Sequence, residues 1–193
     1  LEETLEALGE LVKQGKVRQI GLSNETPWGT MKYLELAETK SLPRVASIQN
    51  AYNLVNRGFE IGLSEVAMHE QVGLLAYSPL AQGTLTGKYL GGQMPQGSRL
   101  ALFGDGPLMM RYKGDKTQQA IEMYVNLAKK YEIDPAQLAI QFCNIQPFVT
   151  STIIGATTME QLKTCIDSVD LDITKEIINE IRSIHKEIPN PAP

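Results

Sequence analysis

A short apolar run followed by a polar, glycine-containing loop is the stretch of this sequence best suited to chemistry. Residues 72–76 are apolar and stop shortly before Pro79, a pattern typical of a buried parallel strand. Tyr77 and Ser78 follow where that strand is expected to end. Because parallel strands present ligand-binding residues at their carboxyl ends, we expect both side chains to face a ligand. From these residues alone, a core aromatic is an equally good interpretation of Tyr77.

The loop after this strand has the features of an anion-binding segment. Gly83 and Gly87 let the backbone approach a ligand closely, and Lys88 adds a positive charge suited to phosphate. A solvated surface lysine is the alternative for Lys88. The loop opens a long segment, residues 83–116, that is rich in glycine and in basic residues. In an acidic protein this concentration favours a lid or binding loop that grips an anion over a flexible surface insertion.

Two further predicted strands also end in polar side chains. Residues 17–22 predict a strand that delivers Ser23 and Asn24 to its carboxyl end, and residues 45–49 predict another that ends at Gln49. Asparagine offers both a donor and acceptors, which suits an amide-bearing ligand. A turn-forming asparagine and a helix-capping serine are equally open alternatives.

A fourth predicted strand, residues 149–154, runs directly into a glycine turn and two threonines that open a helix. Gly155, Thr157 and Gln161 lie in this turn and in the first turn of the helix. The N–H groups at a helix N-terminus form a ready phosphate site. Local sequence alone favours the simpler interpretation, in which a threonine only caps the helix.

The remaining pattern predicts helices between these strands. Thr26-Pro27 and Asp134-Pro135 each open a helix, and further helices are expected over residues 1–13, 62–70, 117–131 and 174–185. For Trp28 we favour structural packing over lining a substrate pocket, and for Arg57 we favour ordering of its loop over contact with an anionic substrate. His69 is expected at the surface.

Composition and net charge argue against one functional class, nucleic-acid binding. The chain has 193 residues, with 42% hydrophobic and 21% charged, which is ordinary for a soluble globular domain with a core. A formal net charge of −4 argues against nucleic-acid binding, which normally needs a clustered basic face. Any anionic ligand must therefore be met by local positive charge.

The cysteines, the apolar runs and the first residues indicate where in the cell the protein is found and whether the sequence is part of a longer protein. Cys143 and Cys165 lack metal-ligand spacing and predict buried, reduced thiols, and neither histidine has neighbours that indicate metal or catalysis. No apolar run approaches the roughly 20 residues of a membrane span, and no signal peptide opens the chain, so we expect a cytoplasmic protein without a membrane partner. The chain begins at Leu1 inside a helical pattern, which leads us to expect part of a longer protein.

Four strand–helix units with polar residues at each strand end predict half of a (β/α)8 barrel, an α/β fold. Over nearly its whole length the sequence resembles the aldo-keto reductases, and most closely the branch that shares features with potassium-channel β subunits. The resemblance depends on four spaced motifs: Gly21-Leu22-Ser23-Asn24, Gln49, the run from Tyr77 to Tyr89, and Ile154-Gly155-Ala156-Thr157-Thr158-x-x-Gln161-Leu162. It implies strands 5 to 8 of a TIM barrel, the C-terminal half.

The resemblance also implies a role for each matching residue in binding NADP(H). Ser23, Asn24 and Gln49 would hold the nicotinamide carboxamide, and Tyr77 would stack on the nicotinamide ring. The pyrophosphate would be wrapped by Ser78, Pro79, Leu80, Ala81, Gln82 and Gly83, with Lys88 and Arg99 closing over it. Gly155, Thr157 and Gln161 would meet the adenosine end. Because Gln161 is neutral where other branches place an arginine on the 2′-phosphate, NAD(H) remains a possible cofactor.

No catalytic residue is assigned to this chain. In the family the catalytic tyrosine, with its aspartate, lysine and histidine partners, lies in the first half of the barrel, before the residue that begins this sequence. We therefore expect residues 1–193 to be the C-terminal half, residues 83–117 a cofactor-covering loop, and residues 174–193 a terminal helix and tail. The missing half is expected as further sequence or as another chain.

The resemblance implies an NADPH-dependent oxidoreductase that reduces a small aldehyde or ketone to an alcohol. The alternative is a regulatory subunit that senses the nicotinamide cofactor with little turnover.

Overall fold

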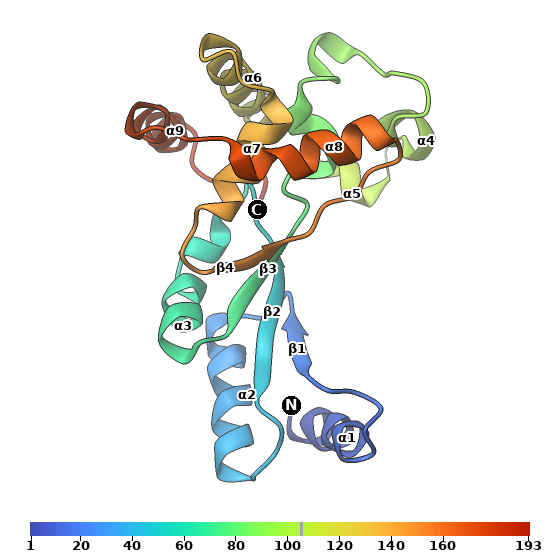
Figure 1. The fold of residues 1–193 in the computed structure, drawn as a ribbon, viewed down its shortest axis with the longest axis vertical. Helices are drawn as coiled ribbons and strands as arrows, with labels where there is room; N and C mark the ends of the chain where they lie inside the picture. Colours follow the sequence, from blue (N-terminus) through green and yellow to red (C-terminus); the bar gives the residue numbers. More distant parts are fainter. Residues whose placement is uncertain (105) are drawn as a thin grey trace.

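The computed structural model describes residues 1–104 and 106–193, in which parallel strands alternate with helices (Figure 1). The strands are β1 (Ile20–Ser23), β2 (Val45–Ala51), β3 (Gly73–Tyr77) and β4 (Val149–Thr152). The longer helices are α1 (Glu2–Lys13), α2 (Pro27–Thr39), α3 (Leu63–Glu70), α6 (Asp115–Lys130), α7 (Pro135–Asn144), α8 (Met159–Asp167) and α9 (Lys175–Glu187). Shorter helical segments are η1 (Gly58–Glu60), η2 (Ala81–Thr86), η3 (Leu90–Gly92), α4 (Arg99–Phe103), α5 (Pro107–Met110) and η4 (Ser168–Asp170).

Within the described residues the strands form one parallel sheet in the sequential order β1-β2-β3-β4. An open doubly wound sheet reverses its strand order at a switch point, whereas consecutive units of a barrel do not. The register pairs Ser23 with Gln49 and Ala51 with Tyr77. The residues that end β1, β2 and β3 therefore meet at one edge of the sheet.

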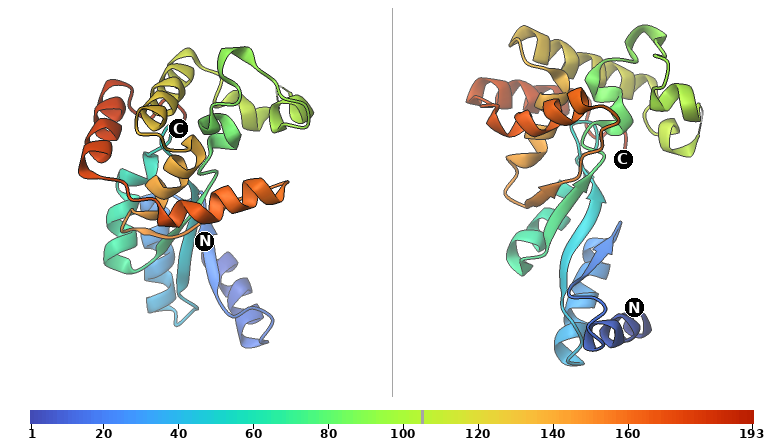
Figure 2. Two further views of the ribbon diagram at one scale, coloured as in Figure 1. Left: turned by 45° about the horizontal axis from the view of Figure 1, so that its top comes forward. Right: turned by 45° about the vertical axis from the view of Figure 1, so that its right-hand side comes forward.

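The two faces of the sheet differ in burial. Ile20, Ile48 and Leu74 are 6%, 1% and 0% exposed and join the hydrophobic core, whereas the neighbouring Gly21 and Gln49 are exposed. Figure 2 shows the strands side by side with α2 and α3 along them. Parallel sheets are normally covered on both faces. The face of this sheet that carries Gly21 and Gln49 is open in the described chain.

Capping residues fix where the helices begin, as the sequence predicts. The Thr26 hydroxyl accepts from Gly29 N at 3.0 Å with Pro27 in the first turn, and the Asp134 carboxylate accepts from Ala136 N at 2.7 Å. Thr174 caps α9 in the same way. Each cap satisfies an N–H group that the helix itself cannot pair. These three helix starts are therefore confirmed.

Two expectations about local structure are wrong. The segment 83–116, expected as one long loop, contains a series of short helical turns, η2, η3, α4 and α5; position 105 within it lies outside the described residues. Trp28 does not pack in the core, since its side chain in the first turn of α2 is 71% exposed. The buried side of α2 is formed by Gly29, Thr30, Tyr33, Leu34 and Ala37 and does not include Trp28.

The proline-rich tail is docked on the molecule. Ala192 is 1% exposed and donates from its N–H to the Val55 carbonyl at 3.1 Å. The Thr117 hydroxyl, in the first turn of α6, donates to the Pro191 carbonyl at 2.8 Å. The tail therefore ties α6 to the loop that follows β2.

Candidate functional site

Four of the predicted site residues converge at the carboxyl edge of the sheet. The Tyr77 hydroxyl donates to the Asn24 side-chain oxygen at 2.8 Å, and the Asn24 N–H donates to the Gln49 carbonyl at 3.0 Å. The Asn24 amide group lies 3.4 Å from the Ser23 hydroxyl. Asn24 has a φ of 52°, a left-handed conformation that asparagine tolerates better than most residues. A cluster of amide, hydroxyl and phenol groups is thus present where a polar ring substituent can be held.

Residues 78–83, which we call the clamp loop, follow directly and have an unusual backbone. Ser78, Ala81 and Gln82 have positive φ angles of 55°, 49° and 59°, and Gly83 has 90°. A non-glycine residue in this region costs about 1 to 3 kcal/mol, so surrounding contacts must maintain the shape. Two internal bonds do so, from Ala81 N to the Ser78 carbonyl at 2.9 Å and from Gly83 N to the Leu80 carbonyl at 2.8 Å. Pro79 is buried beneath the loop.

Lys88 lies over the backbone of the clamp loop. A Cβ atom at Gly83 would stand 3.0 Å from the Lys88 ammonium nitrogen, so only glycine leaves that approach free. The same nitrogen lies 5.2 Å from the centre of the Tyr89 ring, within cation–π range. The result is a positive charge held directly beside bare backbone, an arrangement suited to an anion.

Gln82 connects the clamp loop to α4. Its amide group donates to the Ser78 hydroxyl at 3.0 Å, and its side-chain oxygen accepts from the Arg99 guanidinium. Arg99 is exposed at the start of α4 and Ser98 caps that helix. The structure thus brings Arg99 to the same loop as Lys88.

The last predicted group forms a separate cluster at the N-terminus of α8. The Gln161 side-chain oxygen accepts from Thr157 N at 2.9 Å and from the Thr157 hydroxyl at 3.1 Å. Thr158, not Thr157, is the capping residue, because its hydroxyl accepts from Gln161 N at 3.2 Å. A Cβ atom at Gly155 would meet nothing within 4 Å. This cluster is exposed, and its hydrogen bonds are internal to it.

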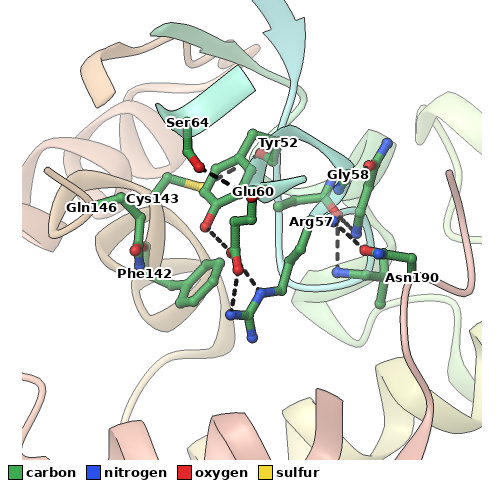
Figure 3. Close-up of polar contacts among 12 residues, drawn as sticks. Tyr52, Arg57, Gly58, Glu60, Ser64, Phe142, Cys143, Gln146 and Asn190 are labelled. Atoms are coloured by element: carbon green, nitrogen blue, oxygen red, sulfur yellow. Dashed lines mark hydrogen bonds and ion pairs between the residues drawn. The ribbon is translucent and has the colours of Figure 1, made fainter. Parts of the chain in front are cut away.

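A partly buried polar cluster in the loop that follows β2 includes Arg57 (Figure 3). The Arg57 guanidinium donates to both Glu60 oxygens, at 2.6 and 2.8 Å, and lies 5.3 Å from the Phe142 ring centre. The Tyr52 hydroxyl donates to Glu60 at 2.7 Å. Burial alone would raise the pKa of Glu60, but the hydrogen bonds from Arg57 and Tyr52 together lower it. Arg57 therefore orders its loop, as the sequence favours.

The remaining chemistry-bearing side chains do not join the site. Cys143 and Cys165 are buried free thiols, and burial raises the pKa of both. His69 is exposed on α3. Across residues 1–104 and 106–193, no three His, Cys, Asp or Glu side chains are grouped in a way that could hold a metal ion, and no helix is long and apolar enough to cross a bilayer.

One residue of the site was not found from the sequence. Asn53 is 0% exposed, and its amide nitrogen donates to the Ser78 carbonyl at 2.9 Å, joining the loop after β2 to the clamp loop. Asn53 stands two positions after the end of β2 in a polar loop, where an asparagine normally indicates only a turn. Its burial is the informative feature, and burial of a loop asparagine has no sequence signal.

The fold and these clusters define a parallel α/β protein with polar side chains gathered at the carboxyl edge of its sheet. The model of the aldo/keto reductase family matches residues 1–186, and the chain belongs to this family, whose members are oxidoreductases that use nicotinamide cofactors. The chain is 51% identical over 193 residues to Protein tas of Escherichia coli (strain K12), covering 100% of this chain and 55% of that protein.

Two further relatives carry more specific names. Over 173 residues the chain is 34% identical to the L-glyceraldehyde 3-phosphate reductase of Escherichia coli (strain K12), covering 88% of this chain and 49% of that protein. Over 192 residues it is 30% identical to a probable voltage-gated potassium channel subunit beta of Oryza sativa subsp. japonica, covering 98% and 58%. The chain thus spans about half the length of these curated relatives.

Proposed function

We propose that this chain is the cofactor-binding, C-terminal half of an NADP(H)-dependent reductase that converts a small aldehyde or ketone to an alcohol. The observation that carries the proposal is the meeting of Asn24, Gln49 and Tyr77 at one sheet edge, directly beside the clamp loop with Lys88 above it. A nicotinamide dinucleotide carries an amide-bearing ring at one end and a pyrophosphate next to it, which matches the sheet edge and the clamp loop beside it.

The side chains at the sheet edge fit the nicotinamide end of such a cofactor. Because the Asn24 oxygen already accepts from Tyr77, the Asn24 amide nitrogen, which lies 3.4 Å from the Ser23 hydroxyl, is the group that can donate to the carboxamide. Gln49, which pairs with Ser23 in the strand register, lies at the same edge. Tyr77 offers a ring face for stacking, as aromatic side chains do for planar ligands. In these roles the residues bind and orient, and orientation contributes to rate by holding the reacting groups in place.

The clamp loop fits the pyrophosphate. Glycine at position 83 leaves backbone accessible, and Lys88 and Arg99 supply positive charge at this loop of an acidic chain. Gly155, Thr157 and Gln161 then serve the adenosine end, through the N-terminus of α8. When bound, the cofactor supplies the hydride, and the chain supplies its position and electrostatic surroundings.

The open sheet leads us to propose that the rest of a (β/α)8 barrel completes the protein. β1 and β4 are the outer strands of the described sheet, and a parallel sheet with one open face and two free edges is rarely stable in water. Further strands would cover the face that carries Gly21 and Gln49. We assign the proton donor of the reaction to that part and no catalytic residue to this chain.

Two measurements on the full-length protein test the proposal. The first is a titration with NADPH and with NADH, in which quenching of protein fluorescence reports binding. The second is an assay of cofactor oxidation with a panel of small aldehydes and ketones. We expect saturable binding that weakens in the variants Gln49→Ala, Tyr77→Ala and Lys88→Gln, and cofactor oxidation with at least one carbonyl compound. Unchanged affinity in all three variants would remove the proposed site.

The same measurements address a second function. The 30% identity to a probable channel β subunit favours a cofactor-sensing regulatory subunit as the alternative. Tight cofactor binding with no turnover on any carbonyl compound would favour that alternative. A preference for NADH over NADPH would fit the neutral Gln161 and would correct the cofactor proposed above.

A further inference from the structure

The Ser78 carbonyl stands at the centre of the contacts that shape the clamp loop. It accepts from Ala81 N at 2.9 Å, within the loop, and from the Asn53 amide nitrogen at 2.9 Å, from outside it. A carbonyl oxygen has two lone pairs, and here both are used. Since Ser78 has a φ of 55° and precedes a proline, this peptide group is held in a conformation that its own sequence does not favour.

Asn53 is itself rigidly placed. Its side-chain oxygen accepts from Val55 N at 3.0 Å and from Asn56 N at 2.9 Å, and its backbone pairs with that of Asn56. With the bond to Ser78, the donor and acceptor ends of the amide are both engaged and the side chain is 0% exposed. One rotamer and one amide orientation satisfy all of these contacts.

The turn that holds Asn53 is anchored from the far side as well. Arg57 N donates to the Asn190 side-chain oxygen at 2.7 Å (Figure 3). Ala192 N donates to the Val55 carbonyl at 3.1 Å. The ion pair of Arg57 with Glu60 fixes the end of the same loop. The C-terminal tail and this ion pair thus form a rigid support behind Asn53.

We propose that Asn53 is a positioning residue that presets the clamp loop for the pyrophosphate of the cofactor. This inference depends on the function proposed above. Its physical basis is preorganisation: a loop held in its binding shape before the ligand arrives loses less freedom on binding, so affinity is higher. Without the Asn53 donor, the strained peptide at Ser78 keeps only the bond inside the loop and relaxes in the free protein.

Two substitutions at Asn53 and the same two at Asn56 test this in the full-length protein. Asn53→Asp keeps the shape and the acceptor for the turn but removes the donor to Ser78. Asn53→Ala adds no charge and removes the donor together with the acceptor for Val55 N and Asn56 N, so the loss of the donor is what the two variants share. Asn56 lies in the same turn, is 6% exposed, and its side-chain oxygen accepts from Gly58 N at 3.3 Å. Asn56→Asp and Asn56→Ala therefore match the changes in charge and size without touching the clamp loop.

We expect both Asn53 variants to raise the Kd and the KM for NADP(H) about tenfold, the effect of one lost hydrogen bond, while kcat at saturating cofactor stays within about twofold. The Asn56 variants should bind the cofactor as the unchanged protein does. A loss confined to Asn53→Asp would assign the effect to the added charge, and equal losses at Asn53 and Asn56 would assign it to general loosening. Either result overturns the proposal.

Amide hydrogen exchange without cofactor provides the independent readout. The N–H groups of Ala81 and Gly83 should exchange faster in both Asn53 variants than in the Asn56 variants. Unchanged exchange there would show that Asn53 does not hold the loop. If instead the exchange rates change as expected but the unchanged protein binds neither NADPH nor NADH, the proposed function fails while Asn53 still supports the loop.

Discussion

The Tyr77 hydroxyl donates a 2.8 Å hydrogen bond to the Asn24 side-chain oxygen, joining the ends of β3 and β1 across the intervening β2. The bond fixes the position of the Tyr77 hydroxyl beside the end of β1. It also determines which end of the Asn24 amide remains for a ligand. One contact thus sets both the aromatic and the amide part of the proposed nicotinamide site.

Removing only the Tyr77 hydroxyl should affect cofactor binding far less than removing its ring. Tyr77→Phe deletes the bond to Asn24 and keeps the stacking surface, so we expect the Kd for NADP(H) to rise about threefold. Tyr77→Ala removes the ring itself, and we expect a rise of about tenfold to a hundredfold. Fluorescence titration of both variants measures the two values. Equal losses in the two variants would mean that the ring does not stack on the cofactor.

Neutralising Lys88 should weaken binding of the cofactor through the loss of charge alone. Lys88→Gln keeps most of the side-chain length and removes the positive charge beside Gly83, so we expect about a tenfold higher Kd for NADP(H) at low salt. The difference from the unchanged protein should shrink as salt is added, because ions screen exposed charges. Lys116→Gln, an exposed lysine at the start of α6, is the control and should leave the Kd unchanged. A loss for Lys88→Gln that is independent of salt would contradict a direct charge contact.

The sequence predicts much of this architecture because its local signals are strong. Thr26, Asp134 and Thr174 precede helices that they cap in the structure, and the strand predicted over residues 72–76 lies at Gly73–Tyr77. The positions of Asn24, Gln49 and Tyr77 at strand ends also predicted that they would lie close together, and the register of the parallel strands brings them to one edge. These are features that depend on neighbours in sequence.

What the sequence did not predict depends on contacts between distant residues. Asn53 reaches Ser78 across 25 positions, and the tail reaches the same loop across 133 positions through Asn190. Trp28 was expected to pack because large aromatics usually do, yet the helix turn that carries it points it outward to 71% exposure. The short helices between Gly83 and Lys116 were not predicted because the many glycines and the prolines there have low helix propensity, so the sequence gives no clear helical pattern.

Adding a methyl group at Gly83 should separate backbone strain from loss of the anion site. Gly83→Ala meets a left-handed φ of 90° and places its Cβ atom 3.0 Å from the Lys88 nitrogen, which must move away. Gly91→Ala has a φ of 68° with nothing within 4 Å and is the matched control. Both should lose about 1 kcal/mol of stability, measured by urea unfolding. Only Gly83→Ala should also raise the Kd for NADP(H), by about tenfold; the same rise in Gly91→Ala would show that strain alone weakens binding.

Replacing Glu60 with glutamine should destabilise the protein, and the loss should disappear in acid. Glu60→Gln removes the charge that pairs with Arg57, and we expect the free energy of unfolding at neutral pH to fall by about 2 kcal/mol, because the guanidinium is left largely buried. Glu65→Gln, on the exposed side of α3, should change it by less than about 0.5 kcal/mol.

The pH dependence follows from the direction of the Glu60 pKa. Burial raises this pKa and the hydrogen bonds from Arg57 and Tyr52 lower it, and the net pKa lies below the ordinary 4.5. A carboxyl whose folded pKa is depressed contributes its full stability above the unfolded pKa and loses it as pH falls through the folded one. The difference between the unchanged protein and Glu60→Gln should therefore be constant from about pH 7 to 5 and shrink below about pH 4.5. Urea unfolding across this range measures it, and a difference that persists at lower pH would mean that shape, not charge, accounts for the loss.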